Sequence, residues 1–183
     1  MKKFVTIVAC ICGALLLGGC GHTALPYSPA FPNVNTLHRL NKGQPIALGK
    51  FTDPKQTRSI TCRMEGGENL PGDVTYVEYI KNALQQELNN ASLYSSKAKT
   101  RLDANLDVID FSSMFDHSTW VIKMTFNDHK QAPYTVRSVY KFSTNFVADI
   151  ACTQVSQAYV PAVQKFLLTL YQNKHFQRTL GHR

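Results

Sequence analysis

The stretch RLDANLDVIDF, residues 101–111, alternates apolar and polar side chains from one end to the other. Successive side chains of a β-strand point to opposite faces, so this alternation predicts a strand with one buried and one solvated face. The apolar face comprises Leu102, Ala104, Leu106 and Val108, and the opposite face carries Asp103, Asn105 and Asp107. Such a strand needs neighbouring strands and a covering layer elsewhere in the chain.

Two further runs with the same alternation follow directly. TWVIKMTFND spans residues 119–128 and YTVRSVYKFS spans residues 134–143. Their apolar faces comprise Trp120, Ile122, Met124 and Phe126 in the first run and Tyr134, Val136, Tyr140 and Phe142 in the second. Because the connections are short, we expect an antiparallel meander. We assign the aromatic side chains to the core; the alternative is that some line a groove for an acyl chain or peptide.

Helical periodicity on both sides of the meander supplies the covering layer. Apolar residues recur every three or four positions after Asp73, a candidate N-cap, and predict an amphipathic helix. They are Val77, Ile80, Leu84, Leu88 and Ala91. A second periodic segment covers residues 147–173, and Pro161 within it predicts a kink or two abutting helices.

The segment PIALGKFTD, residues 45–53, is typical of a first strand, and residues 54–72 contain enough glycine and proline to predict a long irregular loop. The element order is therefore β-α-β-β-β-α. We expect a single α+β domain over residues 45–183, in which an amphipathic helix and a long kinked C-terminal helix cover an antiparallel sheet.

The first twenty residues have the organisation of an export signal. Two lysines precede an apolar run at residues 4–17, which is shorter than the roughly 20 residues that a membrane-spanning helix needs. The run ends in LGGC at residues 17–20 and resembles the lipobox of bacterial lipoproteins. The resemblance implies that a signal peptide, residues 1–19, is removed, and that Cys20 receives a diacylglyceryl thioether and an amine-linked acyl chain, commonly palmitate. The alternatives are a plain secreted protein with a chance cysteine and an uncleaved anchor.

The residues after the lipobox bear on location and reach. In enteric-type lipoproteins an Asp after the lipidated cysteine resembles an inner-membrane retention signal, and this chain has Gly21 there. The resemblance therefore favours a periplasm-facing outer-membrane location over the inner membrane. Residues 20–44 contain three closely spaced prolines and predict an extended tether. The alternative is that Tyr27 and Phe31 pack against the domain or a partner.

Cys62 and Cys152 are the cysteines that remain after the signal peptide, with Cys10 and Cys12, has left and Cys20 has been lipidated. In an oxidising compartment a single remaining pair predicts a disulfide. Closing a loop of about 90 residues stabilises a fold by about 4 kcal/mol in loop-entropy terms. The alternative is two buried free thiols.

The charge of the chain restricts its partners. The formal net charge is +8, and without the two signal lysines 18 basic and 12 acidic side chains give +6. An exported lipoprotein does not normally meet nucleic acid, and the bases here are dispersed rather than interleaved with aromatic residues. We expect the partners to be the membrane, through the lipid anchor on Cys20, and an envelope protein, with no nucleic acid.

Patterns for catalysis or metal binding are weak. The six histidines have no familiar metal-ligand spacing, and the chain has no Gly-x-Ser-x-Gly elbow. Asp103 and Asp107 share one strand face, which suits acid–base chemistry, cation binding or, more commonly, a solvated surface. Asp110 falls on the other face if the strand is regular. We expect no catalytic residues, no metal site and no cofactor.

Three short phrases carry a second resemblance: FTD at residues 51–53, EL at 87–88 and ASLY at 91–94. With the helix, meander and terminal helix, they make the domain similar to small periplasmic lipoproteins of the ABC-transport auxiliary kind. The resemblance implies a non-enzymatic accessory or scaffolding subunit of an envelope assembly or transport system. The alternative is a periplasmic lipid or small-ligand carrier with a groove between sheet and C-terminal helix. A third hypothesis is an envelope hydrolase that uses Asp103 or Asp107.

Overall fold

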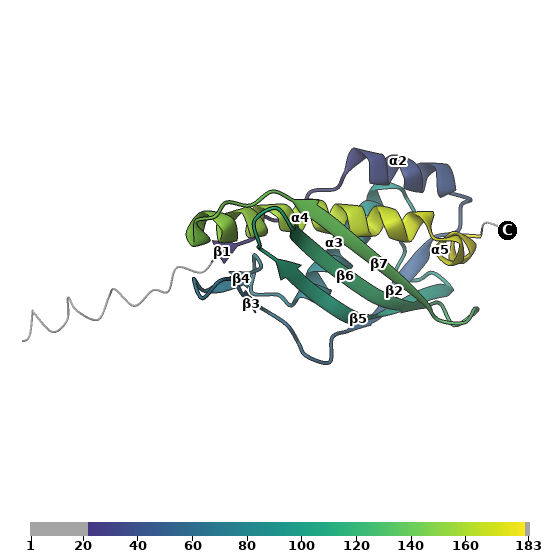
Figure 1. Ribbon diagram of the computed structural model, residues 1–183. Coiled ribbons are helices and arrows are strands. Elements are labelled where there is room, and N and C mark those ends of the chain that lie inside the picture. Colours follow the sequence, from purple (N-terminus) through teal and green to yellow (C-terminus); the bar gives the residue numbers. More distant parts are fainter. Residues whose placement is uncertain (1–21, 182–183) are drawn as a thin grey trace, which may run out of the picture.

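A four-stranded sheet forms one layer of the domain (Figure 1). In the computed structural model, which describes residues 22–181, the strands lie in the order β2-β5-β6-β7. They are β2 (Ile46–Thr52), β5 (Thr100–Ser112), β6 (Ser118–Asn127) and β7 (Tyr134–Phe142). β6 pairs antiparallel with β5 on one side and with β7 on the other, so the predicted meander is confirmed. β2 pairs in parallel with β5, so the sheet is mixed and the prediction of a wholly antiparallel sheet is wrong at this strand. The predicted α+β fold class is confirmed.

The inner face of the sheet is apolar because β6 alternates without interruption. Its inward side chains are almost completely buried: Trp120, Ile122, Met124 and Phe126. Tyr134 and Val136 extend this face onto β7, whereas Tyr140 and Phe142 are only half-buried. The inward set predicted for the meander is therefore confirmed for β6 and fades toward the end of β7.

β5 departs from regular alternation at one point. Its register with β6 shifts between Leu106 and Val108, which marks a β-bulge. Beyond the bulge Ile109 faces inward and Val108 is exposed, so the prediction that Val108 lies on the buried face is wrong. The same shift moves Asp110 to the outer face, which corrects its predicted position.

α3 (Tyr76–Asn90) is the first of two helices on the inner face. The Thr75 side chain accepts a hydrogen bond from the Glu78 N–H, and the Glu78 carboxylate accepts one from the Thr75 N–H, which forms a capping box. The prediction of this helix is confirmed, but the predicted N-cap, Asp73, lies two residues too early. Both residues are good caps, and the reciprocal bond from Glu78 selects Thr75.

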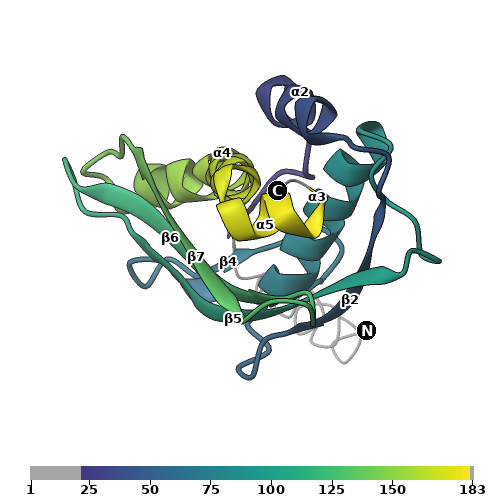
Figure 2. The same ribbon diagram turned by 90° about the vertical axis from the view of Figure 1, so that its right-hand side faces the viewer.

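α4 (Ala148–Gln172) packs on β6 and β7, and Figure 2 shows α3 and α4 in one layer. Of the two forms expected at Pro161, two abutting helices are wrong, because the helix continues through the proline. Burial of the flanking Tyr159 and Val163 helps to hold this turn despite the missing N–H. The short α5 (Lys174–Thr179), which follows α4, is not predicted by the sequence.

The described part of the segment expected to be a tether is folded. β1 (His22–Thr23) pairs in parallel with β4 (Gly67–Asn69), which pairs on its other side with β3 (Ile60–Thr61). α2 (Phe31–Leu40) lies over α3 and α4, on the side away from the sheet (Figure 2). The prediction of an extended tether over residues 20–44 is therefore wrong from residue 22 onward.

α2 forms because its proline occupies a position where helices accept one. Pro32 lies in the first turn, where the missing N–H has no partner to lose, and Leu37 is completely buried. Of the two aromatic residues considered for packing, Tyr27 is partly buried and Phe31 is 81% exposed. Cys20 and the predicted signal peptide, residues 1–19, lie outside the described residues. Within residues 22–181, no helix combines the length and apolarity needed to cross a bilayer.

The predicted disulfide between Cys62 and Cys152 is present. It joins the turn between β3 and β4 to the second turn of α4, and both cysteines are completely buried. The bridge therefore fixes the small β1-β4-β3 sheet to the start of the long helix.

Candidate functional site

A cleft forms where β2 leaves the sheet and β5 continues without it. β2 pairs with β5 as far as Thr52 and Asn105, whereas β5 runs on to Ser112. Within residues 22–181, no strand pairs with this side of β5 beyond Asn105. The loop 53–57 turns back beside this free edge, and a cleft of about 490 Å³ lies between them.

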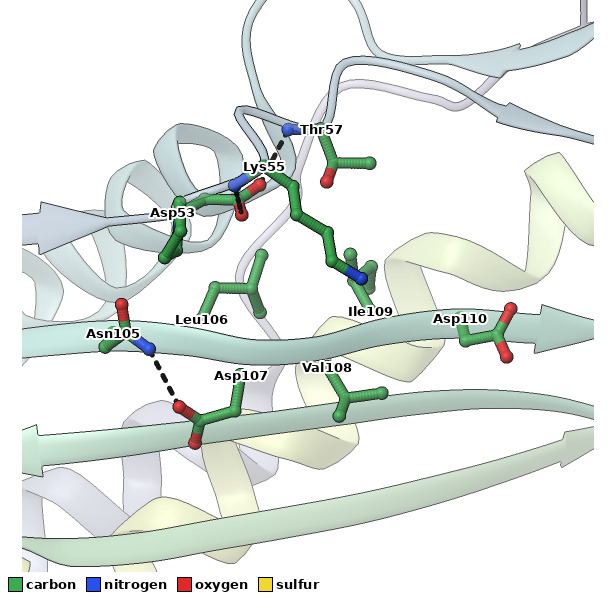
Figure 3. Close-up of a pocket in the computed structure, with 10 residues that line it drawn as sticks. Asp53, Lys55, Thr57, Asn105, Leu106, Asp107, Val108, Ile109 and Asp110 are labelled. Carbon is green, nitrogen blue, oxygen red and sulfur yellow. Dashed lines mark hydrogen bonds between the residues drawn. The ribbon is translucent and has the colours of Figure 1, made fainter.

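The loop beside the cleft is held by its own aspartate. Asp53 accepts hydrogen bonds from the backbone N–H groups of Lys55 (2.9 Å) and Thr57 (2.7 Å). Figure 3 shows the Lys55 side chain reaching toward β5, with Asp110 further along the same strand. The cleft thus combines a fixed loop, one amine and an open strand edge.

Asp103 and Asp107, the sequence candidates for chemistry, lie on the outer face of β5. Asp107 accepts hydrogen bonds from the Asn105 amide (2.8 Å) and the Thr125 hydroxyl (2.7 Å). Asp103 pairs with His129 Nε2 at 2.8 Å. Four strand residues place the two aspartates about 13 Å apart at roughly 3.3 Å per residue. At that separation they neither share a proton nor chelate one cation.

The electrostatics of Asp103 also differ from those of a general acid. Partial burial raises the pKa of Asp103. Hydrogen bonds from His129 and the Lys50 N–H, together with the positive charges of His129 and Arg101, lower it by more than that, so the pKa lies below its ordinary value. A carboxyl that donates a proton near neutral pH needs the opposite shift. Asp103 is therefore an ionised hydrogen-bond acceptor on this face.

A buried carboxyl lies beside the disulfide. Glu68 is 2% exposed, and one of its oxygens accepts a hydrogen bond from the Ser156 hydroxyl. Burial raises the pKa of Glu68 more than this bond and nearby His22 lower it. A Glu68 oxygen and the two sulfurs lie within 4.8 Å of one another, the one such group of potential metal ligands in residues 22–181. Because the sulfurs are bonded to each other, they are not thiolate ligands.

A second buried carboxylate organises the N-terminal segment. Glu87 is completely buried and accepts hydrogen bonds from the Tyr27 hydroxyl (2.5 Å), the Asn33 amide (3.1 Å) and the Tyr171 hydroxyl (2.6 Å). Burial, and then the negative charge of Glu87, raise the pKa of both tyrosines, so they remain donors. Glu87 thus fastens the chain before and within α2 to α3 and α4. Its role is structural.

Exposed apolar side chains gather at the end of the molecule that holds β1. We call this group the apolar tip, and its members are Met64, Met114, Phe115, Phe146, Val147 and Ile150. They come from the β3–β4 turn, the β5–β6 turn, the β7–α4 loop and the first turn of α4.

Glu87 and the apolar tip are each marked in the sequence by a residue type that is unusual at its position. Glu87 lies three positions after Leu84 on the buried stripe of α3, where a charged residue is unexpected. Met114, Phe115 and Phe146 are apolar residues between predicted elements, where polar residues are usual, and Val147 follows at the start of the predicted C-terminal helix. Glu68 had no such signal, because it lies in β4, within the stretch 54–72 that the sequence predicts to be an irregular loop.

The sequence matches no protein-family model, and no curated protein is significantly similar to it. The role of each residue is therefore inferred from its own surroundings.

Proposed function

We propose that this protein is a non-enzymatic cell-envelope lipoprotein, attached by lipid on Cys20 to the outer membrane and facing the periplasm. In this proposal it is an accessory or scaffolding subunit of an envelope assembly or transport system. The observation that carries the proposal is the docking of the chain just after the lipobox: β1 pairs with β4, and His22 lies beside the start of α4.

The docked segment changes what the anchor does. Cys20 precedes His22 by two residues, so their Cα atoms are separated by no more than about 7 Å. The folded domain is therefore held close to the attachment point and does not hang on a long tether. The hydrogen bonds to Glu87 from Tyr27 and Asn33 secure the next part of the segment. A domain fixed in this way presents constant faces to its neighbours, as a scaffold requires.

The outer face of the sheet and the free edge of β5 are the surfaces that we assign to the protein partner. Unpaired backbone groups on a strand edge are able to accept an added strand from another protein. The cleft of about 490 Å³ between β5 and the loop 53–57 leaves room for such a segment. The fixed carboxylates Asp103 and Asp107 beside it offer acceptors for donors on that partner.

The carrier alternative receives less support. The region between the sheet and α4 is filled by side chains that include Trp120, Met124 and Phe166, each at most 1% exposed. The Trp120 indole N–H also donates a hydrogen bond of 3.0 Å to the Val155 carbonyl of α4. An acyl chain would enter there only after α4 had moved off the sheet.

The anchor is tested by mass spectrometry of the full chain purified from membranes. We expect an N-terminal peptide that begins at Cys20 and carries diacylglyceryl and acyl masses, in the outer-membrane fraction. Cys20→Ala should remain unlipidated, whereas Gly19→Ala, which keeps a small residue before the cysteine, should be processed normally. An unlipidated Cys20 in the wild-type chain would overturn the proposal.

The accessory role is tested by crosslinking and affinity purification from mild detergents. A stoichiometric envelope protein should copurify and should be lost when a proline replaces Val108 on the free edge of β5. Recovery of isolated monomer in several detergents contradicts the scaffold role. Native mass spectrometry of the same samples tests the carrier, which would retain a noncovalent lipid mass.

A further inference from the structure

The apolar tip contains most of the large apolar side chains that are exposed in residues 22–181. Met64 is 96% exposed and Phe146 is 84% exposed, and four more apolar residues accompany them. Single exposed apolar residues are normal on a protein, but a group that brings several chain segments together marks an interaction surface.

Hydrogen bonds hold the segments of the tip in one arrangement. The Arg63 guanidinium donates to the Phe146 carbonyl at 2.9 Å and to the Ser113 hydroxyl at 3.0 Å. The Thr144 hydroxyl donates to the Ser113 carbonyl at 3.3 Å. Arg63 adjoins Met64, so the β3–β4 turn, the β5–β6 turn and the β7–α4 loop form one built platform.

The tip lies at the end of the molecule where the described chain begins. His22 Nε2 is 3.7 Å from Asp149, and His22 Nδ1 is 3.3 Å from the Thr153 hydroxyl. Asp149 is the neighbour of Ile150, a member of the tip. Figure 1 shows β1 beside the start of α4 and far from α2 and the C-terminal end. Cys20, two residues before β1, is therefore close to this end.

We propose that the apolar tip docks into the interface of the phospholipid bilayer beside the anchor, so that the domain binds the membrane by protein contacts as well as by lipid. This inference rests on the lipidation of Cys20 in the proposed function. An acyl chain holds a protein to a bilayer only in proportion to its buried methylenes, and apolar side chains inserted beside it add to that attachment. Contacts at two points also fix the orientation of the sheet relative to the membrane.

The charges around the tip indicate the kind of lipid contact. The same segments carry Glu65, Asp116 and Asp149 against the single guanidinium of Arg63. Attraction to anionic headgroups needs clustered lysine and arginine, which these segments lack. Docking is therefore apolar. It should not require anionic lipid, so it should occur on zwitterionic phosphatidylcholine, and it should be insensitive to salt.

The chain offers a matched pair of positions for the test. Phe146 in the tip and Phe31 at the start of α2 are 84% and 81% exposed, so Phe146→Trp and Phe31→Trp each place an indole in solvent at similar exposure. The native Trp120 is buried and contributes the same background to both variants. Each full chain is purified in lipidated form and reconstituted into phosphatidylcholine vesicles with or without brominated acyl chains.

Brominated lipid should quench the emission of Phe146→Trp strongly and that of Phe31→Trp little. Equal quenching of the two variants would overturn the docking of this end. Flotation with the vesicles separates the two proposals: a chain that does not float contradicts the anchor, whereas a floating chain without selective quenching contradicts the tip alone. A blue shift of Phe146→Trp that depends on protein concentration and not on bromination assigns the tip to a second copy, which also overturns the proposal.

Discussion

The two turns of the meander lie at opposite ends of the sheet and differ in whether a buried polar or an exposed apolar side chain occupies them. The distal turn, between β6 and β7, centres on Asp128, which is 3% exposed. Its carboxylate accepts hydrogen bonds from the Lys130 N–H (3.0 Å), the Gln131 amide (2.8 Å) and the Thr179 hydroxyl of α5 (2.7 Å). The turn at the tip, between β5 and β6, instead leaves Met114 and Phe115 in solvent.

The contrast shows that the exposed apolar residues of the tip are not imposed by the fold. The same sheet closes a hairpin at its distal end with polar side chains that bond to their own backbone and to a helix. At the end that holds β1 and the disulfide, Ser118 and Thr144 also bond to the backbone of the turn, yet the apolar side chains of that turn stay exposed. Substitutions of the exposed side chains of the tip should therefore have little effect on stability, whereas substitutions of the buried groups at either end should lower it.

The largest expected effect concerns the disulfide behind the tip. Replacing both Cys62 and Cys152 by alanine removes a crosslink between residues 90 positions apart. Loop entropy then predicts a loss on the order of 4 kcal/mol in the free energy of unfolding. Urea denaturation followed by circular dichroism measures this loss, and reductant should weaken the wild-type chain comparably. A loss below about 1 kcal/mol would show that the packing around Glu68 holds this end without the bridge.

At the distal end, Asp128→Ala should lower the free energy of unfolding by about 2–3 kcal/mol, because it removes a buried acceptor that several buried or part-buried donors share. The Lys130 and Gln131 N–H groups lose this acceptor, and the Thr179 hydroxyl keeps only the His175 carbonyl at 3.1 Å. Thr179→Val removes one of these bonds and serves as the graded control. If Asp128→Ala were neutral, solvent would be satisfying the turn, and the contrast between the two ends would be wrong.

The sequence predicts best where one physical cause decides the structure. Period-two alternation over residues 119–128 and period-3.6 spacing in 73–91 reflect burial of one face, and the structure confirms both elements. The pairing partner of a strand leaves no such trace. The alternation of β5 therefore predicts neither its parallel pairing with β2 nor its bulge, and these two features together create the cleft.

The parts that sequence reasoning missed depend on contacts between distant residues. In FPNVNTLHRL, residues 31–40, Val34, Leu37 and Leu40 recur at helical spacing, but the prolines in and before it favour an extended segment. Burial of Leu37 under tertiary contacts stabilises the helix. Glu87 is stable in the core because donors arrive from Tyr27 and Tyr171, 60 and 84 positions away. The local pattern marks Glu87 as unusual but does not name these distant donors.

The two ends should also respond to pH with opposite signs. Partial burial raises the pKa of Asp128, but hydrogen bonds from Gln131 and Thr179 and from two backbone N–H groups bring it below its ordinary value of 3.8. Its stabilisation is therefore present above that value and is lost as the pH falls through the lower folded pKa. Burial raises the pKa of Glu68 above 4.5, so stability at that end declines as the pH rises above 4.5.

Unfolding measured from pH 3 to 8 on two amide variants separates these effects. Asp128→Asn should have a lower free energy of unfolding than wild type at neutral pH. This difference should shrink as the pH falls below 3.8, the ordinary pKa of an aspartate. Near pH 4, Glu68→Gln should be as stable as wild type or less so, and toward neutral pH it should gain stability relative to wild type. If the stability differences of the two variants from wild type changed in the same direction with pH, the assignment of the two carboxyls would be wrong.

The smallest expected effect on folding is at the tip itself. The double substitution Phe115→Ser and Phe146→Ser should change the free energy of unfolding by no more than about 0.5 kcal/mol, because both side chains are exposed. Phe176→Ser at the distal end, where the ring is completely buried against Tyr171, should lose about 3 kcal/mol or more. Thermal denaturation in detergent compares wild type, the tip double variant and Phe176→Ser without a membrane.

If the tip double variant is strongly destabilised, its rings pack against the domain and are not free for lipid, and membrane docking loses its premise. If it is neutral in detergent but leaves vesicles faster than wild type, docking at this end is separate from folding.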